Sequence, residues 1–278
     1  MNKVKDQSPV IVIEPKSAFS FAEFKDVWSF RELFSTFAVR DIKVRYKQTV
    51  LGGLWAILQP LLTAVVFTFF FGKIAKMPSE GIPYAVFAYS GLVLWTFFSN
   101  GINTASNSTI TQAHLISKIY FPRQILPISS TIIGLVDYGI AVLLIIPMMA
   151  YYRYPLRASC LLLPVIVFGT WILVCGIGFW LSAINVKYRD VRYVVPFFVQ
   201  LLIFVTPVIY PVSIAGRYKW IVTLNPMTGF VEAHRALILG HRPVEVTLLV
   251  LSFGVSILLF ATGWLYFRSV ERLFADII

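Results

Sequence analysis

Six long apolar segments constrain the fold of this chain more than any other feature of the sequence. Five of them contain no charged residue, and the third contains only Asp137. An α-helix needs about 20 predominantly apolar residues to cross the hydrocarbon core of a bilayer. We therefore predict an all-α integral membrane protein with six transmembrane helices. The segments are 54–72, 81–111, 124–152, 158–186, 193–216 and 246–267.

The charged residues lie between and before these segments. They make up 13% of the chain, whereas soluble domains average about 25%. The net charge of +11 arises from loops and the N-terminal segment, which argues against nucleic acid as the partner. Sixteen of the 24 Lys and Arg residues fall on the side of the N-terminus and eight on the other. By the positive-inside rule both termini are expected in the cytoplasm, and the nine basic residues before Leu54 carry most of this difference.

The N-terminal region divides into an arm, residues 1–19, and a helix from residue 20 to 38. Ser20 and Glu23 have the spacing of a capping box. Large apolar side chains then recur at helical spacing, which is typical of a helix that lies in the membrane interface. A soluble helix packed on a partner is the alternative. The apolar positions are Phe21, Phe24, Trp28, Phe30, Leu33, Phe34, Phe37 and Ala38.

A basic stretch leads directly into the first segment. It contains Arg40, Lys43, Arg45 and Lys47. Such side chains anchor many membrane proteins by extending to the interface. They also suit an anionic lipid head group such as a diphosphate. Both roles are compatible with the sequence.

Aromatic side chains are dense in the first two segments. Phe67 and Phe70 lie in the first, and Tyr84, Tyr89 and Trp95 in the second. Aromatics in such positions usually form interfacial belts or pack in the core. Their density also permits a second role, a wall along which sugar rings slide.

The connection between the second and third segments is unusually rich in basic and aromatic residues for a loop. Lys118 and Arg123 flank Tyr120 and Phe121, and on the assigned topology this loop is cytoplasmic. Two aromatics have little reason to face solvent unless something covers them. We therefore expect a docking surface here rather than a plain turn.

The fifth and sixth segments are joined by a long, mostly apolar connection. Residues 225–235 are predicted to form a turn followed by a short helix. An apolar external segment too short to cross the bilayer is typical of a re-entrant or interfacial element. Such an element is placed to cap a conduit.

Motifs of the common enzymes are missing from the sequence. There is no Walker A pattern, no H-E-x-x-H and no G-x-S-x-G. His114, His234 and His241 have no ligand-like partners nearby in the sequence, and the two cysteines give no zinc spacing. We therefore predict a chain without a metal, a bound cofactor or ATP hydrolysis of its own.

Four stretches together resemble the polysaccharide-export permeases of the ABC-2 type, which export O-antigens, capsules and teichoic acids. The resemblance spans residues 20–270. The stretches occur in the family's order along the six segments. They are Tyr46-Lys-Gln-Thr-Val-Leu-Gly-Gly-Leu-Trp-Ala-Ile-Leu-Gln-Pro60, Lys118-Ile-Tyr-Phe-Pro-Arg-Gln-Ile-Leu-Pro127, Asn185-Val-Lys-Tyr-Arg-Asp190 with Thr206-Pro-Val-Ile-Tyr-Pro211, and Asn225-Pro-Met-Thr228 with Arg235.

The resemblance implies a homodimer in the cytoplasmic membrane, paired with two copies of a separate ATPase that binds ATP and Mg²⁺. The implied substrate is a glycan on an undecaprenyl diphosphate carrier. Residues 20–48 become an interface helix and basic entry segment, and 49–278 the transmembrane domain. The implied roles are substrate entry for Arg40, Lys43, Arg45 and Lys47, ATPase coupling for Lys118, Tyr120, Phe121 and Arg123, and an external gate for Asn225, Pro226 and Arg235.

Two other functions remain open at this point. A proton-coupled secondary transporter would want paired buried ionisable groups, and Asp137 is the one candidate. An enzyme acting on lipid-linked sugars would need a carboxylate or His cluster at one interface, and Glu232 with His234 is the nearest match.

Overall fold

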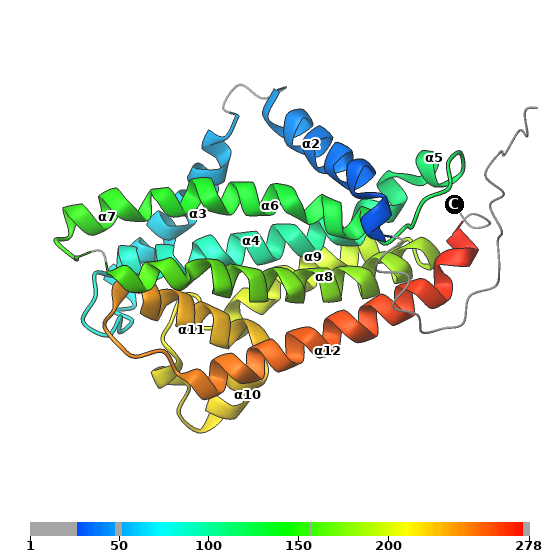
Figure 1. Cartoon of the computed structure of the whole chain (residues 1–278). Coiled ribbons are helices and arrows are strands. Elements are labelled where there is room, and N and C mark those ends of the chain that lie inside the picture. The colour runs from blue at the N-terminus through cyan, green and yellow to red at the C-terminus, as the bar shows by residue number, and fades with distance from the viewer. Residues whose placement is uncertain (1–26, 48–51, 156, 275–278) are drawn as a thin grey trace, which may run out of the picture.

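The computed structural model describes residues 27–47, 52–155 and 157–274, except the side chain of Arg272. The predicted N-terminal arm and the Ser20–Glu23 capping box lie outside these residues. Every regular element within the described ranges is helical. The longest helices run side by side (Figure 1), as expected for a helical membrane protein.

Five helical runs are long and apolar enough to cross a membrane. Their ends agree with the predicted segments to within a few residues, because charged or Pro- and Gly-containing stretches bound each one. The runs are α3 with the π-helix η1 (Leu54–Phe67 and Thr68–Ile74), α4 (Tyr84–Thr111), α6 with α7 (Ile125–Leu143 and Ile145–Tyr151), the 3₁₀ helix η2 with α8 (Ala158–Leu162 and Leu163–Lys187), and α12 (Val246–Val270).

The fifth predicted segment is a shorter helix than the sequence analysis expected. Helix α9 covers Val191–Val205, 15 residues, or about 22 Å at 1.5 Å per residue. Thr206 then turns to an extended conformation. Pro207 and Pro211 cannot donate backbone hydrogen bonds, so the chain leaves the helix instead of continuing to Gly216. The following 3₁₀ helix η3 is Val212–Tyr218.

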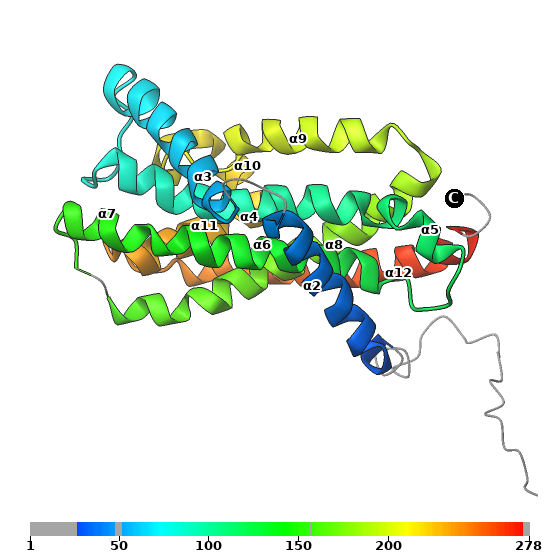
Figure 2. The same cartoon turned by 90° about the horizontal axis from the view of Figure 1, so that it is seen from above.

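Helix α4 forms the centre of the bundle. It packs against α6 on one side and α8 on another, and α12 lies along α8 (Figures 1 and 2). Helices α8 and α12 approach until their backbones touch. A Cβ atom on Gly176 would lie 2.6 Å from the backbone nitrogen of Phe260, and one on Gly263 would lie 2.4 Å from the carbonyl oxygen of Gly176. Small residues permit such close packing of membrane helices.

Helix α2 (Arg31–Lys47) crosses over α6 at an angle (Figure 1). The basic stretch that was expected to follow the interface helix is part of this helix. The apolar face of α2 contacts this chain's own residues: Phe37 is buried in a cluster with Ile116, Phe121 and Ile125. The helix is thereby held against the start of α6 and the short helix α5 (Ala113–Ile116).

The connection between α9 and α12 contains two more helices, α10 (Lys219–Leu224) and α11 (Pro226–Leu239). The turn at Asn225 and the helix after it agree with the sequence prediction. Helix α11 is buried over most of its length and packs on α12 and α4. Gly240 ends it in the left-handed conformation, as glycine commonly does after a helix. A last 3₁₀ turn, η4, follows α12 at Glu271–Leu273.

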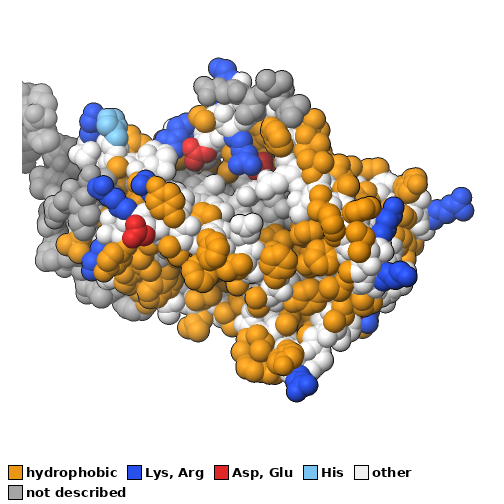
Figure 3. All heavy atoms as spheres, turned by 180° about the vertical axis from the view of Figure 1, so that it is seen from behind, with side chains coloured by type: hydrophobic (Ala, Val, Ile, Leu, Met, Phe, Trp, Pro, Cys, Tyr) orange, Lys and Arg blue, Asp and Glu red, His pale blue; other side chains and the backbone are white. Residues whose placement is uncertain are grey.

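Two helices leave broad apolar faces uncovered within the described chain. Figure 3 shows the side of the molecule that carries α3 and α9, with apolar side chains over most of it. An apolar surface of this extent needs lipid or another protein surface against it. The exposed side chains are Leu54, Trp55, Leu62, Val65 and Val66 on α3, Phe69 and Phe70 on η1, which continues α3, and Tyr193, Val194, Phe197, Phe198, Leu201, Leu202, Phe204 and Val205 on α9.

Candidate functional site

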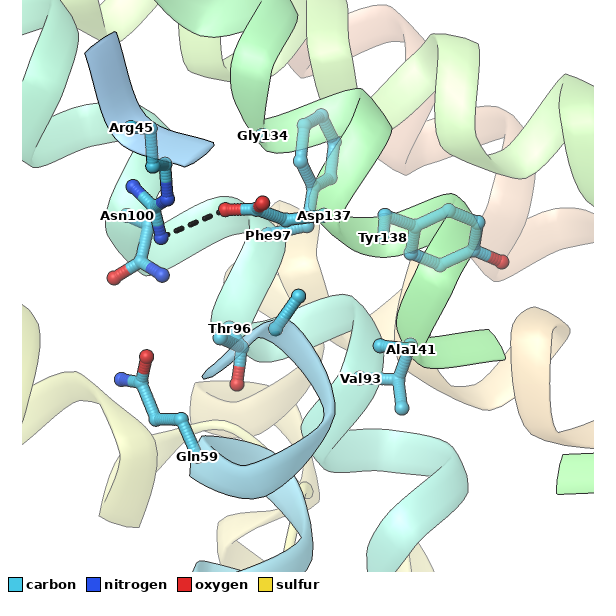
Figure 4. A pocket seen from close by; sticks show the side chains of 11 residues that line it. Arg45, Gln59, Val93, Thr96, Phe97, Asn100, Gly134, Asp137, Tyr138 and Ala141 are labelled. Carbon is cyan, nitrogen blue, oxygen red and sulfur yellow. Dashed lines mark ion pairs between the residues drawn. The ribbon is translucent and has the colours of Figure 1, made fainter. Parts of the chain in front are cut away.

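A narrow polar crevice opens where α2, α3, α4 and α6 meet. Figure 4 shows Arg45, Gln59, Thr96, Asn100 and Asp137 gathered around it, each from one of these four helices. Apolar residues of α4 and α6 complete its walls. Polar groups at this depth in a membrane bundle usually face a water-filled space or a partner, so the crevice is the strongest candidate site in the described chain.

Asp137 is paired across this crevice. Its Oδ2 lies 2.8 Å from Nη2 of Arg45, and Tyr46 donates its hydroxyl hydrogen to Oδ1. Only 7% of Asp137 is exposed. The carboxylate inside the third predicted span therefore has two partners from the end of the basic helix α2. Pairing of this kind offsets the cost of a charge at membrane depth.

The hydroxyl of Tyr46 is held in its protonated form. Burial, and then the hydrogen bond and the negative charge of Asp137, raise the pKa of Tyr46. The phenol therefore remains a hydrogen-bond donor to the carboxylate at physiological pH. The arrangement thus joins a guanidinium and a phenol, both hydrogen-bond donors, to one carboxylate.

The other basic residues of the predicted entry segment do not join this pair. Arg40 donates to Asp41 and to Gln112, and its guanidinium lies 5.0 Å above the ring centre of Phe37. Lys43 and Lys47 are exposed. The structure thus brings only Arg45 of the four to the crevice.

The predicted coupling loop divides into exposed and buried residues. Tyr120 is 93% exposed, and Lys118 beside it is exposed as well. Phe121 is buried, with its ring centre 5.9 Å from that of Phe37. Arg123 donates to the backbone oxygen of Glu271 at the end of α12. Phe121 and Arg123 therefore hold the loop in place, while Lys118 and Tyr120 are the residues that a partner can reach.

The five predicted conduit aromatics also divide into buried residues and residues that are at least partly exposed. Tyr84, Tyr89 and Trp95 are buried in the core around α4. The hydroxyls of Tyr84 and Tyr89 donate to the backbone oxygens of Ile209 and Ala141, at 2.6 and 2.8 Å. Phe67 is half-buried against Phe71, and Phe70 is exposed on η1.

The residues of the predicted external gate organise the start of α11. The side chain of Asn225 accepts from the backbone N–H of Met227 at 3.0 Å, which caps the helix. It also donates to Thr206 Oγ1 at 2.8 Å, where α9 ends. Pro226 occupies the first helical position, where its missing N–H has no cost.

Arg235 is the largest fully buried side chain of the described chain, with 1% of it exposed. Its Nη1 lies 2.7 Å from Oε1 of Glu232, and Nη2 donates to the backbone oxygens of Pro207 and Val208 at 3.2 and 2.9 Å. The guanidinium lies 3.7 Å from the ring centre of Phe87. Arg235 thus joins α11 to α4 and to the non-helical segment that follows α9.

The sequence analysis missed a charged cluster that joins η3 to the loops before α4 and after α11. Glu80 accepts from His241 at 3.0 Å, from Arg242 at 2.9 Å and from Ser213 at 3.2 Å. Glu80 has a φ of +57°, which is uncommon for a residue with a side chain. No spacing in the sequence relates Glu80 to its partners, because Glu80 precedes α4 whereas the other three residues lie between α9 and α12.

Within the described ranges, no group of three or more His, Cys, Asp or Glu residues is arranged to hold a metal ion. His234 is buried in α11 and hydrogen-bonds to the Tyr138 hydroxyl at 2.8 Å.

The family model described as "ABC-2 type transporter" matches residues 32–239. The O-antigen export system permease protein RfbA of Myxococcus xanthus is 28% identical, over 91% of this chain and 97% of its own. RfbA of Klebsiella pneumoniae is also 28% identical, over 86% of this chain and 92% of its own.

The polysialic acid transport protein KpsM of Escherichia coli is 26% identical, over 84% of this chain and 92% of its own. The family model covers α2 to α11 and so includes the crevice, the 118–123 loop and Arg235. The resemblance inferred from four sequence stretches is thereby confirmed, and the chain is a member of the ABC-2 type transporter family.

Proposed function

We propose that this chain is the membrane subunit of an exporter that moves a lipid-linked polysaccharide across the cytoplasmic membrane. The observation that carries the proposal is the similarity, over most of both chains, to permeases named for O-antigen and polysialic acid transport. The proposed carrier is undecaprenyl diphosphate, and a separate ATPase supplies the energy.

The proposed assembly is a homodimer with two ATPase subunits. The uncovered faces of α3 and α9 support a second copy as their partner, since both lie on the same side of the molecule (Figures 2 and 3). In this assembly α9 completes the sixth crossing together with the segment after it. Helices α10 and α11 form the re-entrant external element, and both termini are cytoplasmic.

The pairing of Arg45 with Asp137 supports a role in substrate entry. A diphosphate offers Arg45 a stronger anionic partner than one carboxylate, because it carries more charge and more acceptor oxygens. We infer that the head group competes with Asp137 for Arg45 and so loosens the contact between α2 and α6. Lys43 and Lys47, exposed nearby on the same helix, attract the head group first.

Tyr120 and Lys118 are proposed to contact the ATPase. Their exposure favours this role, and the buried Phe121 transmits a displacement of the loop to Phe37 on α2. In this mechanism, ATP-driven closure of the partner moves α2 relative to α6 through that aromatic contact.

Depletion of the chain in its native cells tests the proposed function. Loss of the chain should cause diphosphate-linked glycan to accumulate on the cytoplasmic side, with surface glycan falling in parallel. Purification of the tagged chain in mild detergent should recover an ATPase in about equal copy number. Surface glycan that persists after depletion would contradict the proposal. Export that survives ATP depletion but stops when the proton gradient collapses would favour a secondary transporter.

A further inference from the structure

Four polar side chains follow one face of α4, the central helix of the bundle. Thr96, Asn100, Asn103 and Asn107, here called the polar stripe, are spaced i, i+4, i+7 and i+11, which places them on one face of a helix. All four are partly exposed. Thr96 and Asn100 lie in the middle of α4 beside the Arg45–Asp137 pair (Figure 4). Asn103 and Asn107 continue the stripe toward the end of α4 at Thr111.

Most of the stripe lacks hydrogen bonds within the described chain. The side chains of Asn107, Asn185 and Asn225 each bond to protein groups. In contrast, the side chains of Asn100 and Asn103 bond to no described residue, and Oδ1 of Asn103 is buried without a partner. Among the described asparagines, the two whose side chains lack a partner are thus neighbours on the same helix face.

This face is unsuited to lipid. An amide placed in hydrocarbon without a hydrogen bond is strongly unfavourable, because it loses the hydrogen bonds that it makes in water. Exposed side chains elsewhere on the long helices are apolar, as at Val165 and Phe168 on α8 and Leu258 on α12, and such side chains suit lipid. The stripe therefore needs an occupant that both donates and accepts hydrogen bonds at membrane depth.

The chemistry of the stripe points to a neutral, hydroxyl-rich occupant. Carboxamides offer two donors and one acceptor oxygen each, and the hydroxyl of Thr96 offers both. Gln59 of α3 adds a fifth such group at the same crevice. The stripe itself has no charge, so it favours neither anions nor cations. Sugar hydroxyls, which donate and accept equally, match this set.

We propose that the polar stripe is part of the inner wall of the conduit and exchanges hydrogen bonds with the hydroxyls of the passing glycan. This inference rests on the proposed function. The arrangement places charged and neutral recognition side by side: Arg45 meets the diphosphate, and Asn100 with Asn103 meets the sugars behind it. The residues were not singled out as site residues by the sequence analysis, which looked to aromatics for the conduit wall.

Accessibility to a water-soluble thiol reagent tests the placement. In a background in which Cys160 and Cys175 are replaced by Ser and Ala, the variants Asn100→Cys and Asn103→Cys are compared with Leu258→Cys. Leu258 is 61% exposed on α12 and serves as the lipid-facing control. In open membrane sheets that contain the assembled exporter, a charged methanethiosulfonate should label both stripe positions at least tenfold faster than position 258.

Two results would overturn the placement. One is labelling of positions 100 and 103 no faster than that of position 258, which would put the stripe in lipid or in a dry core. The other is efficient disulfide formation between two copies at these positions without labelling, which would make the stripe a contact between subunits.

Export measurements test the interaction with sugar. The double variant Asn100→Leu/Asn103→Leu should lower surface glycan at least tenfold, while Asn100→Ser/Asn103→Ser should retain most of it. Retained ATPase co-purification by the Leu variant separates loss of sugar contact from loss of assembly. Normal export by an assembled Leu variant would refute the contact between the polar stripe and the glycan but leave the proposed function intact. Absence of glycan export by the wild type would refute the proposed function itself. If the Leu variant does not assemble, the labelling of positions 100 and 103 decides whether the polar stripe lines the conduit.

Discussion

Arg45 and Asp137 are 92 positions apart in the sequence, and their charged groups lie 2.8 Å apart. One belongs to the helix that crosses over the bundle, and the other lies in the middle of α6. The contact fixes the end of the basic helix at the level of the polar crevice. It also gives Asp137 a partner, which removes the main argument for a proton relay through a lone carboxylate.

Disruption of this pair should destabilise the protein by about 1–2 kcal/mol, between the values for exposed and fully buried ion pairs, because Arg45 is partly exposed. Arg45→Gln and Asp137→Asn should each lower the melting temperature in detergent by about 2–6 °C. The melting temperature of the double variant Arg45→Gln/Asp137→Asn should fall by less than the sum of the two single decreases. Additive losses would show that the two side chains do not interact.

The contribution of Tyr46 should depend on pH in one direction only. Its pKa is raised in the folded protein by burial and by Asp137, so the folded state holds the phenolic proton more tightly than the unfolded state. The added stability is therefore fully present below about pH 10, the ordinary value for tyrosine, and is lost as the pH rises above it.

Thermal denaturation of the wild type and of Tyr46→Phe across pH checks this prediction. The difference between the two proteins should be constant from about pH 6 to 9 and should shrink at higher pH. A difference that grows with pH has the opposite sign and would rule out the raised pKa.

The space beside Arg235 should not accept a methyl group. A Cβ atom on Gly91 would lie 2.8 Å from Nη2 of Arg235 and 2.9 Å from the backbone oxygen of Val208. Gly91→Ala should therefore destabilise the protein by about 1–3 kcal/mol. Gly139→Ala on α6, where a Cβ atom meets nothing within 4 Å, is the matched control and should be neutral or slightly stabilising. Equal melting temperatures for the two variants would contradict the close packing at Gly91.

The two aromatics of the 118–123 loop should respond differently to truncation. Tyr120→Ala should leave the melting temperature unchanged and weaken ATPase co-purification, because the side chain is exposed. Phe121→Ala should lower stability by about 3–5 kcal/mol, as for other buried aromatics. The measurement is a thermal melt paired with quantification of the bound ATPase. Tyr120→Ala with normal ATPase binding and turnover would exclude it from the contact.

The sequence predicted the long helices well because their signal is local. Apolar runs bounded by charged residues define α4, α8 and α12 to within a few residues, and Asn225-Pro226 marks the start of α11. The predicted length of α9 was wrong for a local reason too. The uncharged run from Tyr193 predicted a helix to residue 216, but the helix ends at Val205, before Pro207.

The site was harder to predict because it is made of long-range contacts. Nothing near Asp137 in the sequence indicates Arg45 as its partner, and the burial of Phe121 depends on Phe37 in another helix. The i, i+4, i+7 spacing of Thr96, Asn100 and Asn103 was visible in the sequence. Its meaning depends on which face of α4 the neighbouring helices leave open, and that is a tertiary property.

The contact between Gly176 and Gly263 limits how the molecule can change shape. If α12 slid along α8 by one helical turn, Leu259 or Phe267 would arrive where Gly263 now sits, and the backbones would be forced apart. These two helices are therefore expected to move as one rigid body during transport. The motion that opens a passage is then expected from other helices, above all α3 and α9 with their uncovered apolar faces, which would rotate against the α8–α12 pair.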